Sequence, residues 1–185
     1  MHSPSCEPTM TLLRVSQLPK AYRLSRKVRN PSIMDPEVAE MMVEILATLA
    51  CGIFAGAAIY VNLVEQPARL SCGVSVALTE WRPSYKRGTA MQAPLAVIGS
   101  TLGFISWWLE KDTAWLIGGV CLLAVVPFTL IVMLPTNKML ENDKLDSSSA
   151  HAEQLLRRWG RLHAVRSGLS FLALVIFLFA LGHRS

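Results

Sequence analysis

The chain has 185 residues, of which 52% are hydrophobic and only 17% are charged. The mean hydropathy of +0.38 and the clustering of apolar residues into long runs predict one domain of membrane-spanning helices rather than a water-soluble fold. The net charge of +5 resides in residues 1–34, while residues 35–185 are balanced, so the body of the chain gives no support to nucleic-acid binding.

Residues 1–34 form a basic leader with six Lys or Arg side chains against one acid, and we expect it to be disordered. This composition resembles a mitochondrial transit peptide, which would place the protein in a mitochondrial membrane. Two alternatives stay open from the sequence. In one, the leader is a tail that lies near anionic lipid, and in the other, translation begins at Met34.

The membrane domain is predicted to cover residues 35–185, and its first span to cover about residues 42–64. Asp35 and Pro36 are typical of a helix start, and Pro67 is expected to end the helix. Gly52 and Gly56 form a G-x-x-x-G motif, which favours close packing of a neighbouring helix on that face.

The second and third spans are predicted at about 89–109 and 114–134, and only four residues separate them. They must therefore form a tight antiparallel hairpin. Three tryptophans flank this turn, as expected of an aromatic belt at one membrane interface: Trp107, Trp108 and Trp115. Pro127 is expected to kink the third span, which residues 134–138 close.

A last helix is predicted over residues 150–182. At about 1.5 Å per residue it is longer than a bilayer core of about 30 Å, so we expect residues 163–182 to span the membrane and the first part to protrude. The fold class is therefore all-α: an integral membrane four-helix up-down bundle with a long, partly protruding last helix. Three arginines in the protruding part are expected to anchor it at the surface: Arg157, Arg158 and Arg161.

The orientation follows from the positive charges beside the spans. Residues 65–88 and 135–162 together carry nine Lys or Arg, against two on the opposite face when the leader is left out. That bias places both longer loops on the cytoplasmic or matrix side. With the leader included, the counts are nearly equal and predict no orientation.

Polar side chains gather where the last helix enters the membrane. Their spacing of i, i+4, i+7 and i+11 puts four residues in one stripe: Trp159, His163, Arg166 and Ser170. Asn62 and Glu65, spaced i, i+3, lie near the end of the first span, and an up-down topology brings them to the same membrane face. We expect His163 and Arg166 to turn inward and Arg166 to pair with Glu65. The alternative is that Arg166 is another surface anchor.

Four blocks of sequence resemble the anthrone oxygenase-like family of small four-helix membrane proteins: "GAAIYVNLVEQPARL", "WRPSYKRGTAMQAPLAVIGS", "LPTNKML" and "LLRRWGRLHAVRSGLSFLAL". They occur in the family's order and cover about residues 42–182. The resemblance implies a membrane bundle and, in the characterised branch, oxidation of an anthrone to an anthraquinone by O₂ without an added cofactor. One departure is Gln66, where many members have His. If that His is the catalytic base, the resemblance implies impaired or altered activity in this chain.

The residues that match the family's pattern suggest a mechanism. His163 or Glu65 would remove a proton from the substrate, and Arg166 and Asn62 would stabilise the oxyanion that forms. Trp159 and Tyr60 would stack on a flat ring system, and Ser170 lies on the same stripe. No C-x-x-C spacing or other metal signature is present among the four cysteines, so we expect no metal site. The resemblance implies that no cofactor is needed.

Two functions are therefore weighed. The first is a cofactor-independent oxidoreductase that binds an apolar aromatic or quinone-like molecule at the membrane edge. The second is a non-catalytic membrane scaffold or assembly protein that uses the polar stripe for helix packing. Replacing His163 should abolish turnover in the first case and lower stability or partner binding in the second.

Overall fold

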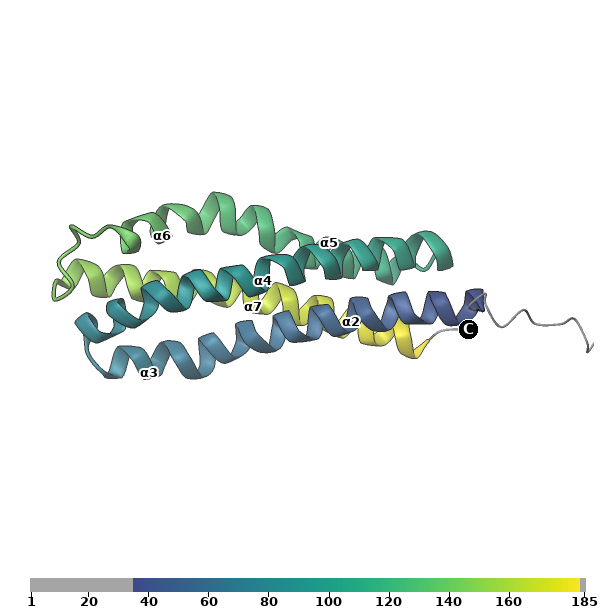
Figure 1. Cartoon of the computed structure of the whole chain (residues 1–185), viewed down its shortest axis with the longest axis horizontal. Coiled ribbons are helices and arrows are strands. Elements are labelled where there is room, and N and C mark those ends of the chain that lie inside the picture. The colour runs from purple at the N-terminus through teal and green to yellow at the C-terminus, as the bar shows by residue number, and fades with distance from the viewer. Residues whose placement is uncertain (1–34, 184–185) are drawn as a thin grey trace, which may run out of the picture. The chain divides into compact units, whose positions relative to one another are not determined.

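The structure is a computed structural model that describes residues 35–183, and within that range it is helical with no strand. Four helical stretches run up and down beside one another, and each is long and apolar enough to cross a membrane (Figure 1). The predicted all-α up-down bundle is confirmed, and by these lengths and compositions the protein is an integral membrane protein. The leader, with its predicted transit peptide, lies outside the described residues.

The four stretches are built from six α-helices and two π-helical turns. The first stretch contains α2 (Pro36–Tyr60), η2 (Val61–Glu65) and α3 (Gln66–Ser71), and the second is α4 (Val74–Glu110). The third contains α5 (Thr113–Phe128), η3 (Thr129–Met133) and α6 (Leu134–Glu141), and the fourth is α7 (Ala150–Gly182).

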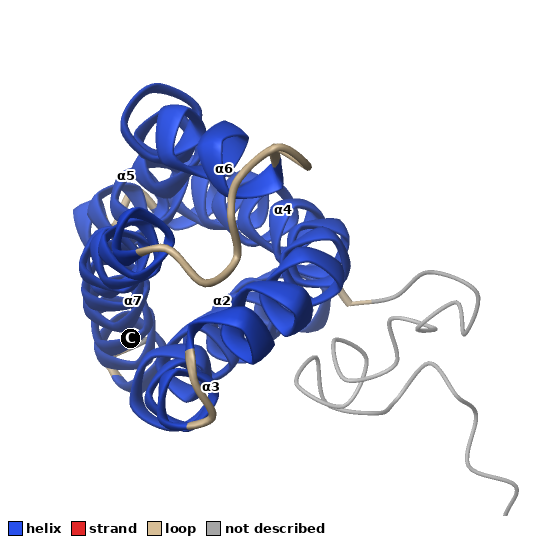
Figure 2. Ribbon diagram, turned by 90° about the vertical axis from the view of Figure 1, so that its left-hand side faces the viewer, coloured by secondary structure: helices blue, strands red, loops and turns tan. Residues whose placement is uncertain are grey.

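The helices form a ring in which α2 and α5 each pack against α4 and α7 (Figure 2). The turn between α4 and α5 is as short as predicted: Lys111 ends α4 with a left-handed φ of 62°, and the Asp112 side chain accepts a hydrogen bond from the Ala114 backbone. At the opposite end, Gly73, with φ of 91°, precedes α4.

Two hydrophobic cores follow one another along the bundle. The first is built mainly from α2, α5 and α7 and lies in the apolar half, with Phe54, Trp115 and Phe177 as its largest buried side chains. The second lies in the half formed by α3, α6 and the early turns of α4 and α7, and contains Trp81 and Trp159. His163 and Arg166, in the middle of the α7 stripe, lie between these two cores.

The expectation that Pro67 ends the first helix is wrong, because the chain stays helical to Ser71. In a regular α-helix the Pro67 ring would crowd the Leu63 carbonyl. Here the Gln66 N–H instead bonds to the Val61 carbonyl, across a π-helical turn, and Pro67 falls in the first turn of α3, where no N–H is needed.

The third stretch repeats this arrangement. The Leu134 N–H bonds to the Thr129 carbonyl, and Pro135 follows in the first turn of α6. The helix therefore continues to Glu141 instead of closing at residues 134–138, and Figure 1 shows the bend between α5 and α6. Each π-helical turn allows a proline to be included without ending the helical stretch.

The predicted second span of about 89–109 forms the later part of a longer helix, because α4 begins at Val74. One further expectation needs correction. The aromatic belt is incomplete, because Trp115 is fully buried and packs on Phe177 at 5.0 Å between ring centroids. Trp108 is 66% exposed beside the turn, with the Lys111 ammonium 4.0 Å from its ring.

Candidate functional site

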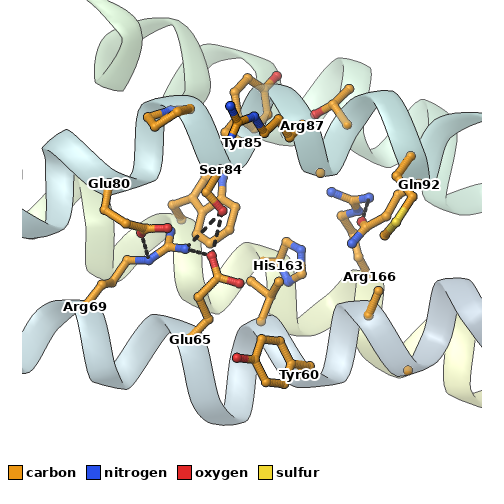
Figure 3. A pocket seen from close by; sticks show the side chains of 18 residues that line it. Tyr60, Glu65, Arg69, Glu80, Ser84, Tyr85, Arg87, Gln92, His163 and Arg166 are labelled. Carbon is orange, nitrogen blue, oxygen red and sulfur yellow. Dashed lines mark hydrogen bonds and ion pairs between the residues drawn. The ribbon is translucent and has the colours of Figure 1, made fainter.

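A cavity of about 880 Å³ opens between α2 and α4, with α7 forming its floor (Figure 3). Every residue that lines it comes from α2, η2, α3, α4 or α7. It therefore lies at the junction between the two cores. Residues 164–181 of α7 rise by roughly 27 Å beyond this level, nearly the thickness of a bilayer core, so we expect the cavity to lie near one edge of the membrane.

His163 is held on the cavity floor by Asn62, which lies in the π-helical turn η2. The Asn62 amide donates to the Gly160 carbonyl at 2.9 Å, and its oxygen lies 2.6 Å from Nδ1 of His163. Because that oxygen can only accept, Nδ1 must carry a proton, and in neutral His163 the lone pair is on Nε2. Within residues 35–183, Nε2 has no hydrogen-bond partner, although the side chain is 2% exposed.

Ser167 completes this arrangement. Its hydroxyl lies 2.6 Å from the same Asn62 oxygen and 2.9 Å from the Ala58 carbonyl. The Asn62 oxygen thus faces two polar groups of α7. The predicted proximity of Asn62 and His163 is a direct hydrogen bond in the structure.

Arg166 does not pair with Glu65, contrary to the expectation from the sequence. Its Nη2 donates to the Gln92 side-chain oxygen on α4 at 2.9 Å, and its guanidinium lies 5.6 Å from the Phe54 ring centroid. The side chain is only 8% exposed, and in the described part of the chain its Nε has no hydrogen-bond partner and no carboxylate forms an ion pair with it. Arg166 is therefore a buried, uncompensated cation beside His163.

Glu65 is paired elsewhere because α3 places Arg69 one turn after it. One Glu65 oxygen accepts from Nη2 of Arg69 and from the Ser84 hydroxyl, the latter at 2.6 Å. Arg69 also forms an ion pair with Glu80 at 2.7 Å, so this cation lies between two carboxylates (Figure 3). One oxygen of Glu65 already accepts two hydrogen bonds in this network, whereas Nε2 of His163 accepts none within the described residues. His163 is therefore the better placed proton acceptor.

Trp159 forms an aromatic wall of the cavity. Its ring centroid is 4.8 Å from the His163 ring and 5.9 Å from the Arg69 guanidinium, and Trp81 meets it edge to face at 5.7 Å. The ring is 4% exposed and its Nε1 is buried without a hydrogen-bond partner among residues 35–183. Trp159 therefore presents a rigid apolar surface next to the histidine.

The other predicted residues divide between the cavity and the helix contacts. Tyr60 lies at the mouth and is 56% exposed. Ser170 is fully buried outside the lining and donates to the Ser167 carbonyl of its own helix. Gln66 also lies outside the lining, where its amide donates to the Leu156 carbonyl at 2.9 Å and ties α3 to α7.

The block that begins at Trp81 and the residues just before it supply much of the cavity lining, although no role was predicted for them. Glu80, Ser84, Arg87 and Met91 are spaced i, i+4, i+7 and i+11, the same spacing as the stripe of α7, and all four line the cavity. Gln92, one position further, holds Arg166. Helical periodicity across Pro83 and Pro94 was the signal that could have revealed this face.

The groups around the cavity are therefore one histidine, three arginines and two carboxylates, besides aromatic and small apolar residues. Counted with a neutral histidine, the lining carries one positive charge in excess. No cluster of three or more potential metal ligands occurs within the described range. The arrangement can accept a proton at His163 and stabilise negative charge at Arg166.

Comparisons with known proteins agree with this picture. The sequence model of the family described as anthrone oxygenase matches residues 81–176, which include the cavity residues of α7 and most of those of α4. The chain is 27% identical over 137 residues to an anthrone oxygenase of Claviceps purpurea (strain 20.1), a match that covers 66% of this chain and 79% of the relative. No solved structure matches the chain.

Proposed function

Because the chain belongs to the anthrone oxygenase family, we propose that it is a membrane oxidoreductase that oxidises an anthrone-like polycyclic aromatic substrate with O₂ in the cavity between α2, α4 and α7. One observation carries the proposal. His163 is buried, its Nδ1–H is fixed by Asn62, and its Nε2 lone pair is left for a ligand in the cavity.

The first step is removal of a proton from the CH₂ group of the anthrone by Nε2 of His163. That CH₂ lies between two aromatic rings and is conjugated to a carbonyl, so the charge of the anion is spread onto the carbonyl oxygen. Arg166 would stabilise this oxyanion through its positive charge, since its side chain lines the cavity and no carboxylate forms an ion pair with it in the described part of the chain. Asn62 would orient the histidine and not bind the oxyanion, because its amide N–H already donates to the Gly160 carbonyl.

The electron-rich anion then reduces O₂. Transfer of one electron and recombination of the two radicals forms a C–O bond at the former CH₂ carbon, which gives a peroxide. The proton held at His163 passes to the outer peroxide oxygen, which gives a hydroperoxide. His163 then removes the remaining proton from the same carbon while the O–O bond breaks, so the second carbonyl forms and hydroxide leaves. The hydroxide takes the proton from His163 and departs as water. One anthrone and one O₂ thus give one anthraquinone and one H₂O.

The cavity walls suit a flat, apolar ligand. Trp159 provides a buried ring beside the base, and Tyr60 provides a second ring at the mouth. The position at the membrane edge lets the substrate arrive from the lipid, where such a molecule concentrates. Binding by Trp159 and Tyr60 and proton transfer by His163 then act on the same ligand.

The test is O₂-dependent consumption of anthrone by membranes that contain the protein. His163→Ala should lower turnover by about 100-fold or more, because a positioned base contributes about that factor. His151→Ala is the matched control, since His151 is exposed near the start of the same helix and lies outside the cavity. Wild-type activity no higher than that of empty membranes would reject the proposal and favour the scaffold function.

A further inference from the structure

Two glycines line the cavity without an apparent structural need for glycine. Gly56 lies on α2 and Gly88 on α4, and both have ordinary helical backbone conformations. A Cβ atom added at either position would meet no atom within 4 Å. Glycine in a helix interior is less favourable than alanine, so both positions lower helix stability without a packing gain.

The glycines of the apolar core behave differently. A Cβ at Gly103 or Gly118 would come within 2.6 Å of the Phe177 ring, and one at Gly99 within 2.8 Å of Leu122. These residues are glycine because a neighbour occupies the space. Gly52 differs from these, because a Cβ there would lie 3.6 Å from Leu174, an ordinary van der Waals distance. The described residues therefore leave room for a Cβ at both glycines of the G-x-x-x-G motif.

Gly56 and Gly88 line the same cavity as the buried polar groups. Two exposed side chains with large apolar surfaces also line it, Tyr60 from α2 and Met91 from α4. At the inner end lie Arg166, 8% exposed with an unpartnered Nε in the described part of the chain, and the free Nε2 of His163. An apolar opening that leads to an uncompensated cation suits a ligand with flat rings and one oxygen that carries negative charge.

We propose that Gly56 and Gly88 form a ring slot: the rings of a bound polycyclic aromatic ligand lie between α2 and α4 against these two glycines, with the ligand's oxygen at Arg166. The slot sets how many fused rings the cavity accepts. This inference rests on the proposed function for the class of ligand, but it concerns binding and not turnover.

The experiment measures binding of anthraquinone to the full chain in lipid nanodiscs, corrected for partition into empty nanodiscs. The double variant Gly56→Leu/Gly88→Leu should raise the Kd for anthraquinone about tenfold, because the added side chains overlap the volume of the rings. Each single variant should have a smaller effect. Gly168→Leu is the matched control, since Gly168 is an exposed helical glycine with open space around it and lies outside the lining.

An unchanged Kd in the double variant, or an equal increase in Gly168→Leu, would overturn the slot, as would a wild-type protein that does not bind anthraquinone. Anthrone turnover, measured in parallel, separates the two proposals. If wild type binds anthraquinone, the double variant does not, and wild type shows no anthrone turnover, the slot is supported and the oxygenase is rejected. Turnover with equal kcat/KM in wild type and double variant supports the oxygenase and rejects the slot.

Discussion

Asn62 and His163 form the contact on which the proposed chemistry depends. The two residues are 101 positions apart in the chain, yet the Asn62 oxygen lies 2.6 Å from Nδ1 of His163. The amide orientation is fixed independently, because its nitrogen donates to the Gly160 carbonyl. A single asparagine thereby sets both the tautomer and the ring orientation of the histidine.

Removing that asparagine should lower kcat while leaving substrate binding nearly intact. We expect Asn62→Ala to reduce kcat for anthrone about 10- to 100-fold, with KM changed by less than about threefold, because the base loses its orientation and the cavity walls remain. Gln154→Ala, an exposed polar position on the same helix as His163, is the control. If Asn62→Ala lowers the amount of folded protein and the total activity by the same factor, kcat per folded molecule is unchanged. That result would show that Asn62 only supports the fold.

Arg69 and Arg166 show how differently two buried arginines can be used. Arg69 is neutralised by Glu65 and Glu80, and its side chain is 4% exposed. Arg166 has only the neutral Gln92 as a hydrogen-bond partner within the described residues. A buried cation without a counter-ion is costly to maintain, which is consistent with a negative charge that forms or binds in the cavity.

At the scale of the helices, glycines decide how closely α4, α5 and α7 approach. Gly103 of α4 and Gly118 of α5 both face the Phe177 ring of α7. Phe177 is fully buried and also contacts Trp115. The apolar core is therefore built around one aromatic side chain for which two helices leave room.

Gly118→Ala should destabilise the protein by about 1–3 kcal/mol, because the new methyl group would overlap the Phe177 ring. Gly168→Ala should instead be neutral or stabilising by up to about 1 kcal/mol, since it meets no neighbour and alanine favours the helix. Thermal unfolding in detergent measures both. Partial recovery in Gly118→Ala/Phe177→Leu would assign the cost to that overlap, and a Gly118→Ala protein as stable as wild type would contradict it.

At the scale of the whole molecule, the cavity lies between the two cores, and the proposed function requires this level to be at the membrane edge. The positive charges at residues 157–161 lie on exposed positions of α7 outside the apolar half, as expected of surface anchors. Leu172 is 49% exposed but lies about 16 Å further along the same helix. Its exposed surface should face lipid rather than water.

Cysteine labelling with a membrane-impermeant maleimide tests this placement in a background without the four native cysteines. Arg161→Cys should react from the cytoplasmic or matrix side and Thr113→Cys from the opposite side, whereas Leu172→Cys should react from neither, because hydrocarbon covers it. Sealed vesicles of both orientations distinguish the two sides. Labelling of Leu172→Cys as fast as Arg161→Cys would reject the proposed depth of α7.

The number of helical stretches, their alternating direction and the full extent of the last helix could be predicted from the sequence alone. Those features depend on the length and periodicity of apolar runs, which are local properties of the chain. The stripe of α7 was visible for the same reason, and so was the shared depth of Asn62 and His163. The corresponding stripe of α4 was missed because two prolines interrupt a helix that packing nevertheless maintains.

Only the tertiary structure decided which polar groups meet. From the sequence, Glu65 could pair with either Arg69 or Arg166. In the structure it pairs with Arg69, one turn further along the same helical stretch, and Gln92 of α4 binds Arg166. Helix rotation and a one-residue shift in register fix such contacts, and neither changes the pattern of hydrophobicity along the sequence. Composition and periodicity therefore determined the bundle, whereas the packing of α2, α4 and α7 determined which side chains face the cavity.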